Sequence, residues 1–114
     1  MTSETKVQRI LRILEDAKAE RILVLDVRGK TFLADFFIVC TGNSDLHIRS
    51  ISERLIEQMK KEKIKVAHIE GEGSGWALLD FGDVVCHVMR EEQRQFYDIE
   101  SLWKSLPIRE EYPF

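Results

Sequence analysis

The sequence predicts an α/β protein in which helices cover a mixed β-sheet, in the order α-β-β-α-β-β-β-α. Segments whose apolar residues recur every three or four positions alternate with short, β-branched apolar runs, which are typical of helices and strands respectively. Of the 114 residues, 44% are hydrophobic and 32% are charged, so the chain can bury a core without disulfides or metal. We therefore expect one domain spanning residues 1–114.

The first expected element is a core-facing helix over Thr5–Ala19. Its apolar residues fall on one stripe: Val7, Ile10, Leu11 and Leu14. Ile13 lies outside this stripe and either widens the buried arc or stays exposed for a partner, the first being favoured. The run Arg21–Val27 is short and nearly continuously apolar, as in a strand covered on both faces, and Gly29 marks the following turn.

A second buried strand is expected over Ala34–Gly42, antiparallel to the first because the two are close in sequence. Asn43 or Ser44 can cap the next helix, since a short side-chain oxygen accepts from its free amides. That helix is expected over Asp45–Glu62, with its buried face formed by Ile48, Ile51, Leu55 and Met59.

The second half of the chain predicts three more strands and a short helix. Ile64–Ile69 alternates apolar and polar residues, and the helix crossover makes this strand parallel to the second one. Trp76–Phe81 and Val84–Met89 flank a tight turn at Gly82-Asp83 and predict a hairpin. A short helix within Glu91–Leu106 carries the apolar residues Tyr97, Ile99, Leu102 and Trp103.

Composition argues against several classes of function. The chain has 17 Lys and Arg against 20 Asp and Glu, a net charge of −3, so binding to free nucleic acid by phosphate contacts is disfavoured. It contains no apolar run long enough to span a membrane, and we expect a cytosolic protein. Cys40 and Cys86 lie in separate apolar runs, so both are expected to stay reduced and buried.

The sequence offers no convincing catalytic or metal site, and no cofactor is predicted. The turn Thr41–Ser44 before a helix is typical of nucleotidyltransferases, but these enzymes need paired carboxylates on the next strand, where 64–69 has none. Asp80 and Asp83 straddle a hairpin turn, which explains both. The glycines of 71–75 precede a strand, which disfavours a phosphate loop. The histidines lie in separate elements: His47, His68 and His87.

One surface of the predicted hairpin suggests a binding function. Val84, Cys86 and Val88 suit the interior, which turns His87 and Met89 outward by strand alternation. Pairing across the hairpin places them with Trp76 and Leu78 in one accessible patch, and an exposed Trp is typical of protein-binding surfaces. The alternative, equally supported, is that a helix, such as the C-terminal one, covers Trp76.

Several of these segments together resemble the ribosomal silencing factor, or Iojap-like, family. The resemblance covers nearly the whole chain and rests on 34–39, 41–44, 70–71, 76–89 and 94–103. Its most specific part joins Trp-x-x-x-Asp-x-Gly-Asp-x-x-x-His, from Trp76 to His87, to Arg-x-x-Tyr-x-x-Glu-x-x-Trp, from Arg94 to Trp103. The chain departs from the usual pattern at Cys86, where a small aliphatic residue is more common, and at the pair Phe36 and Phe37.

The resemblance implies a nucleotidyltransferase-like fold without transferase activity. It also implies binding to the large ribosomal subunit through its universal protein numbered fourteen, which blocks joining of the small subunit and represses translation when nutrients are short. Acidic residues would complement a basic ribosomal protein: Asp80, Glu70 and Glu72. The docking residues it implies are Trp76, Leu78, Asp80, His87 and Met89, with Trp76 as the first anchor. The resemblance also implies a homodimer, and members of the family in organelles are linked to large-subunit assembly. The alternative function, suggested only by Gly42-Asn43-Ser44 and the order of the elements, is a small nucleotidyltransferase-like enzyme.

Overall fold

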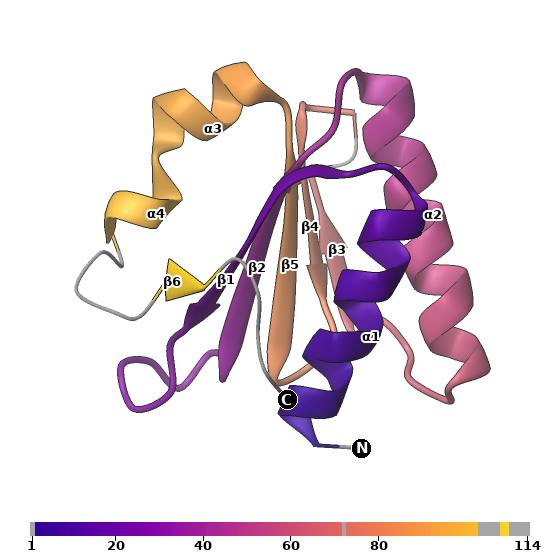
Figure 1. Cartoon of the computed structure of the whole chain (residues 1–114), viewed down its shortest axis with the longest axis vertical. Coiled ribbons are helices and arrows are strands. Elements are labelled where there is room, and N and C mark those ends of the chain that lie inside the picture. Colours follow the sequence, from indigo (N-terminus) through magenta and orange to yellow (C-terminus); the bar gives the residue numbers. More distant parts are fainter. Residues whose placement is uncertain (1, 72, 103–107, 110–114) are drawn as a thin grey trace.

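The protein is a mixed α/β structure built on a six-stranded sheet with the strand order β3-β4-β5-β2-β1-β6 (Figure 1). The computed structural model describes residues 2–71, 73–102 and 108–109. In chain order, the elements are α1 Ser3–Asp16, β1 Glu20–Asp26, β2 Phe36–Thr41, α2 Asp45–Lys61, β3 His68–Glu70, β4 Trp76–Asp80, β5 Val84–Met89, α3 Glu91–Tyr97, α4 Ile99–Leu102 and β6 Ile108–Arg109. Figure 1 shows α1 and α2 on one face of the sheet and α3 and α4 on the other.

This arrangement confirms the predicted fold class and the expected sequence of elements up to the last helix. That helix is divided into α3 and α4 by Asp98, whose left-handed conformation ends α3, and the pair β1–β6 was not predicted. Trp103, which the sequence placed in the same helix, lies outside the described residues.

Helix α1 begins at a side-chain cap and presents its apolar stripe to the sheet. The Thr2 Oγ1 atom accepts a hydrogen bond from the Thr5 amide at 3.1 Å, which satisfies one of the free donors of the first turn. The stripe residues Val7, Ile10 and Leu14 are fully buried. Ile13 is partly buried against the same core, so the favoured interpretation of a wider buried arc is confirmed.

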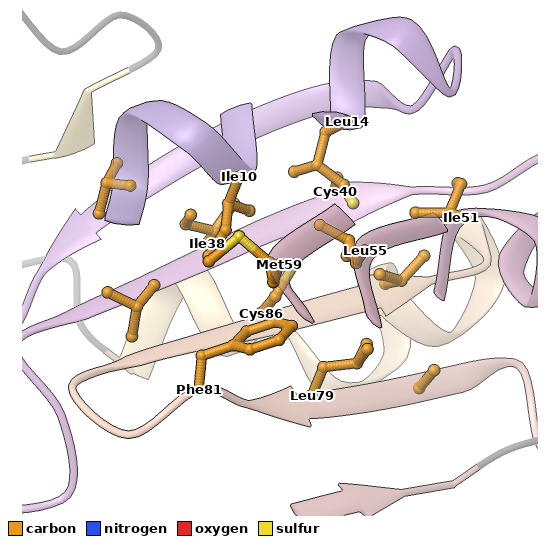
Figure 2. Packing of buried hydrophobic residues seen from close by; sticks show 14 of the residues in the cluster. Ile10, Leu14, Ile38, Cys40, Ile51, Leu55, Met59, Leu79, Phe81 and Cys86 are labelled. Carbon is orange, nitrogen blue, oxygen red and sulfur yellow. The ribbon is translucent and has the colours of Figure 1, made fainter. Parts of the chain in front are cut away.

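Helix α2 is capped by Ser44, one of the two residues predicted for this position. The Ser44 Oγ atom accepts from the His47 amide at 3.0 Å. Figure 2 shows Ile51, Leu55 and Met59 of α2 pointing toward the sheet, where they meet residues from α1 and the strands. All three are fully buried, as the predicted helix face required.

Two strand pairings are as predicted: β1 and β2 are antiparallel, and β4 and β5 form a hairpin. The parallel pairing of β2 with β5 was not predicted. The third strand is shorter than Ile64–Ile69, with only three residues in β3, and it pairs antiparallel with β4 at the sheet edge. It runs in the same direction as β2, as expected, but β4 and β5 separate the two because the hairpin occupies the inner positions.

Both cysteines are buried as free thiols in the layer between the helices and the sheet (Figure 2). A hydrogen bond with Cys40 and burial raise the pKa of the Cys86 thiol well above its ordinary value. A thiolate is the reactive form of cysteine, so both features suppress reactivity.

We therefore expect neither thiol to react with a water-soluble aromatic disulfide in the native protein at neutral pH. Both thiols should be titrated within seconds after unfolding in guanidinium chloride. The absorbance of the released thiolate measures the count in each state. Rapid release of one equivalent from the native protein would show that a cysteine is accessible.

Candidate docking surface

The central strand β5 is buried on both faces, and this corrects part of the predicted patch. Val84, Cys86 and Val88 lie in the main core, as predicted. His87 and Met89 do point to the opposite face, but they are not accessible: Met89 is fully buried and His87 is 6% exposed. The expectation that these two side chains contribute to an open patch is therefore wrong.

A second apolar layer on this face of the sheet explains the burial. It consists of Leu25, Val27, Ala34, Phe37, Val39, Val85, Met89 and Ile99. Ile99 comes from α4, while the partly buried Trp76 and Leu78 of β4 close the layer toward the β3 edge. Because β5 lies between β2 and β4, neighbouring side chains surround its outward residues from both sides.

Trp76 combines both alternatives that the sequence left open, since α3 covers it only in part. Its ring lies 4.8 Å from the ring of Tyr97, at the end of α3, with an interplanar angle of 48°. On its other side the indole Nε1–H donates to His87 Nδ1 at 3.1 Å. The side chain nevertheless remains half-buried, and so keeps part of its surface in solvent.

The pairing of β3 with β4 brings acidic side chains to the same face as Trp76. In the register of the two strands, Glu70 lies opposite Leu78 and His68 lies opposite Asp80. Glu70 shares a face with Leu78 because directly opposed residues of antiparallel strands do so. Asp80 lies two residues after Leu78 on β4 and so points to the same face. Both carboxylates therefore flank Leu78. Glu70 is exposed and lies 2.8 Å from His68. Glu72, the third acidic residue expected here, lies outside the described residues.

The turn role that the sequence suggested for both aspartates of the hairpin is confirmed for Asp80, whereas the Asp83 side chain pairs with another element. The Asp80 Oδ1 atom accepts from the Gly82 amide at 2.8 Å, which leaves the rest of its half-buried carboxylate toward solvent. Asp83 instead binds Lys6 of α1, with the Lys6 Nζ at 2.7 Å from the Asp83 Oδ1 atom. The two carboxylates therefore serve separate partners.

Two exposed aromatic residues of α3 extend this surface, and sequence reasoning gave them no surface role. Phe96 is 81% exposed and Tyr97 is 52% exposed, and their rings meet edge to face at 5.0 Å. The sequence held one clue: adjacent residues of a helix point about 100° apart, so two adjacent aromatic residues cover a wide arc of a short helix. We call Trp76, Leu78, Phe96 and Tyr97 the aromatic surface.

His87 lies beneath this surface and is neutral at physiological pH. Burial lowers the pKa of His87 to about 4. Because Nδ1 accepts the indole N–H of Trp76, the proton of the neutral ring resides on Nε2. Within the described part of the chain, this buried Nε2 has no hydrogen-bond partner.

Arg94 holds α3 against the sheet, which the sequence did not reveal because a charged helical residue is usually exposed. It is only 3% exposed. Its Nε atom lies 2.7 Å from Glu100 of α4, and Nη1 donates to the Arg21 carbonyl at 2.7 Å and to the Thr41 Oγ1 at 2.9 Å. One guanidinium thus links α3, α4, β1 and β2.

The turn that suggested a nucleotide site is explained by packing and capping. A Cβ atom at Gly42 would lie 2.7 Å from the Ile48 side chain, so glycine permits the close approach of α2. The backbone N–H of Asn43 donates to His47 Nδ1 at 2.9 Å, and His47 Nε2 lies 2.9 Å from the Ala17 carbonyl oxygen. In residues 2–71, 73–102 and 108–109 no group of three potential metal ligands comes together, and no helix could cross a bilayer.

Comparison with known proteins places the chain among factors that act on the ribosome. The family model described as "Ribosomal silencing factor during starvation" matches residues 1–113. The chain is 34% identical over 108 residues to a ribosomal silencing factor of Halalkalibacterium halodurans, covering 94% of this chain and 92% of that protein. It is 39% identical over 95 residues to the factor of Bacillus subtilis, covering 82% of this chain and 80% of the relative.

The fold agrees with this similarity. A crystal structure of a protein from Chromobacterium violaceum superposes with a TM-score of 0.88 at 34% identity, covering 91% of this chain and 88% of that one. The relatives are named as ribosomal silencing factors, a regulatory family associated with the ribosome and not a family of enzymes, which confirms the prediction of a non-enzyme. A match over nearly the whole chain, supported by relatives above 30% identity, shows that this protein belongs to the ribosomal silencing factor family.

Proposed function

We propose that this protein binds the large ribosomal subunit through its universal protein numbered fourteen and blocks joining of the small subunit, which represses translation when nutrients are limiting. The observation that carries the proposal is the aromatic surface with its acidic flank, found in a member of the ribosomal silencing factor family. Bound at the face where the subunits meet, a folded protein of this size excludes the small subunit sterically.

The chemistry of the surface fits a basic protein partner better than naked RNA. Trp76 and Leu78 offer apolar contact at the centre, and Glu70 and Asp80 lie beside them. Carboxylates repel phosphates and attract the lysines and arginines of a ribosomal protein. The net charge of −3 has the same consequence for the molecule as a whole.

The five predicted docking residues divide into two groups in this proposal. Trp76, Leu78 and Asp80 are half-buried on β4 and contact the partner directly. His87 and Met89 are buried beneath them and support the surface from within. Trp76 is the main anchor because a large aromatic side chain that becomes fully buried contributes most to an interface.

We expect Trp76→Ala to weaken binding to the large subunit by at least about 30-fold, which corresponds to about 2 kcal/mol. The measurement is sucrose-gradient sedimentation of the protein with isolated subunits, scoring comigration and the fraction of joined ribosomes. Phe32→Ala is the matched control, because Phe32 is a fully exposed aromatic residue of the β1–β2 loop, away from this surface. It should bind like the wild type.

Three outcomes of this experiment contradict the proposal in different ways. Wild-type protein that stays at the top of the gradient would refute subunit binding. Wild-type binding that leaves subunit joining unchanged would refute the blocking mechanism. Equal affinity of Trp76→Ala and the wild type would show that another surface makes the contact.

The proposal extends to location and assembly. Action on assembled subunits places the protein in the cytoplasm, where fractionation should find it with ribosomes. A homodimer is also part of the proposal, and light scattering at increasing concentration tests it. A mass that stays at the 13.3 kDa of one chain would refute the dimer.

A further inference from the structure

We infer that His87 is a positioning residue that fixes the orientation of the Trp76 indole through its Nδ1 atom. The inference concerns a buried contact within the protein, whereas its effect on binding rests on the proposed function. His87 itself does not touch the partner, because only 6% of it is exposed.

The packing around His87 holds its imidazole ring in place. Phe37 of β2 meets the ring edge to face, with the centroids 5.4 Å apart at 79°. Trp76 lies on another side at 5.9 Å and 40°, and Leu78 is the cross-strand neighbour on β4. Because these neighbours come from β2 and β4, the two strands paired with β5, Nδ1 is a fixed acceptor.

This fixed acceptor determines how the tryptophan is presented. The hydrogen bond of 3.1 Å holds the nitrogen edge of the indole against the sheet, and Tyr97 restricts the ring from α3. A side chain held in one rotamer before binding loses less entropy when the partner covers it. The bond also occupies the indole N–H, so the partner meets the carbon surface of the ring and recognises it by apolar or cation contact.

The unpaired nitrogen of His87 argues that stability alone does not explain a histidine here. The buried Nε2–H has no partner in the described part of the chain, which costs free energy that an apolar side chain of similar size would avoid. Among residues 2–71, 73–102 and 108–109, the bond to Trp76 is the one polar interaction that the ring makes. The acceptor atom is therefore the property that distinguishes histidine from leucine at this position.

Two substitutions separate the acceptor from the packing. His87→Leu removes the acceptor and keeps an apolar side chain, whereas His87→Asn places an amide oxygen near the position of Nδ1 and keeps the acceptor. We expect His87→Leu to weaken binding to the large subunit about tenfold, the usual value of one hydrogen bond, and His87→Asn to stay within about threefold of the wild type. Sedimentation with isolated large subunits measures both.

A readout independent of the ribosome tests the contact itself. The indole N–H resonance of Trp76 in a proton–nitrogen correlation spectrum is identified by its loss in Trp76→Phe. It should move toward the solvent-exposed value in His87→Leu and stay near the wild-type position in His87→Asn. In the Trp76→Phe background, where the donor is absent, His87→Leu should cause no further loss of affinity.

The outcomes distinguish this inference from the proposed function. If Trp76→Ala binds normally, the proposed function is wrong, while the resonance shift still tests the contact. If Trp76→Ala loses binding but His87→Leu binds like the wild type, the positioning role is wrong and the proposed function stands. Equal losses in His87→Leu and His87→Asn, or an unchanged indole resonance in His87→Leu, would also overturn the inference.

Discussion

Replacing Arg94 with alanine is expected to destabilise the protein by about 3–5 kcal/mol, the usual cost of removing one partner of a buried ion pair. The substitution leaves the Glu100 carboxylate, the Arg21 carbonyl and the Thr41 hydroxyl without their common donor. It also removes the link between the sheet and the α3–α4 segment. Lysine cannot restore these contacts, because a single ammonium does not reproduce the planar fork of the guanidinium.

Urea unfolding followed by circular dichroism measures this effect. The matched control is Arg90→Ala, four residues earlier, where the arginine is 36% exposed and makes long ion pairs of 3.6 Å with Asp45 and 3.4 Å with Glu92. Exposed pairs of this kind contribute about 0–1 kcal/mol. Similar unfolding midpoints for the two variants would show that the buried network around Arg94 does not stabilise the fold.

Lowering the pH from 6.5 to 4 is expected to remove about 3 kcal/mol of stability through His87 alone. In the folded protein the pKa of His87 is about 4, because burial disfavours its charged form. In the unfolded chain the pKa is about 6.5, so between these values the unfolded state binds one more proton. The stabilisation by neutral His87 is complete above pH 6.5, is lost progressively as the pH falls, and changes no further below pH 4.

The unfolding free energies of the wild type and His87→Asn across this range isolate the effect. The variant lacks the titrating ring, so its stability should fall less steeply, and the difference between the two curves is the contribution of His87. His68→Asn serves as the control, because His68 is an exposed histidine. Parallel curves for the wild type and His87→Asn would contradict the predicted linkage.

Much of the fold follows from local patterns in the sequence. The apolar stripes of α1 and α2, the Ser44 cap and the β4–β5 hairpin are set by residues close together in the chain, and all were predicted. The edge position of β3 was not predicted, because it depends on which strand pairs with β2. That choice is made between distant segments and leaves no local pattern.

The candidate surface was likewise predicted only where it depends on residues close together in the chain. Alternation along the hairpin correctly placed Trp76, Leu78, His87 and Met89 on one face. It could not reveal that Phe37, Ile99 and the α3 residue Tyr97 enclose part of that face. The burial of Arg94 in α3 was equally hidden, since its partners Arg21 and Thr41 belong to the distant strands β1 and β2. Patterns define which side chains lie together, whereas distant elements decide which remain accessible.

The parallel pairing of β2 with β5 has a consequence for synthesis. The two central strands join residues 36–41 to residues 84–89, so the sheet cannot close until the β4–β5 hairpin is available. Contacts between such distant segments form late, because the loop between them must first lose its entropy. A nascent chain therefore emerges from the ribosome without a completed sheet. The surface that we propose for silencing forms only after residues 84–97 of this chain have been translated.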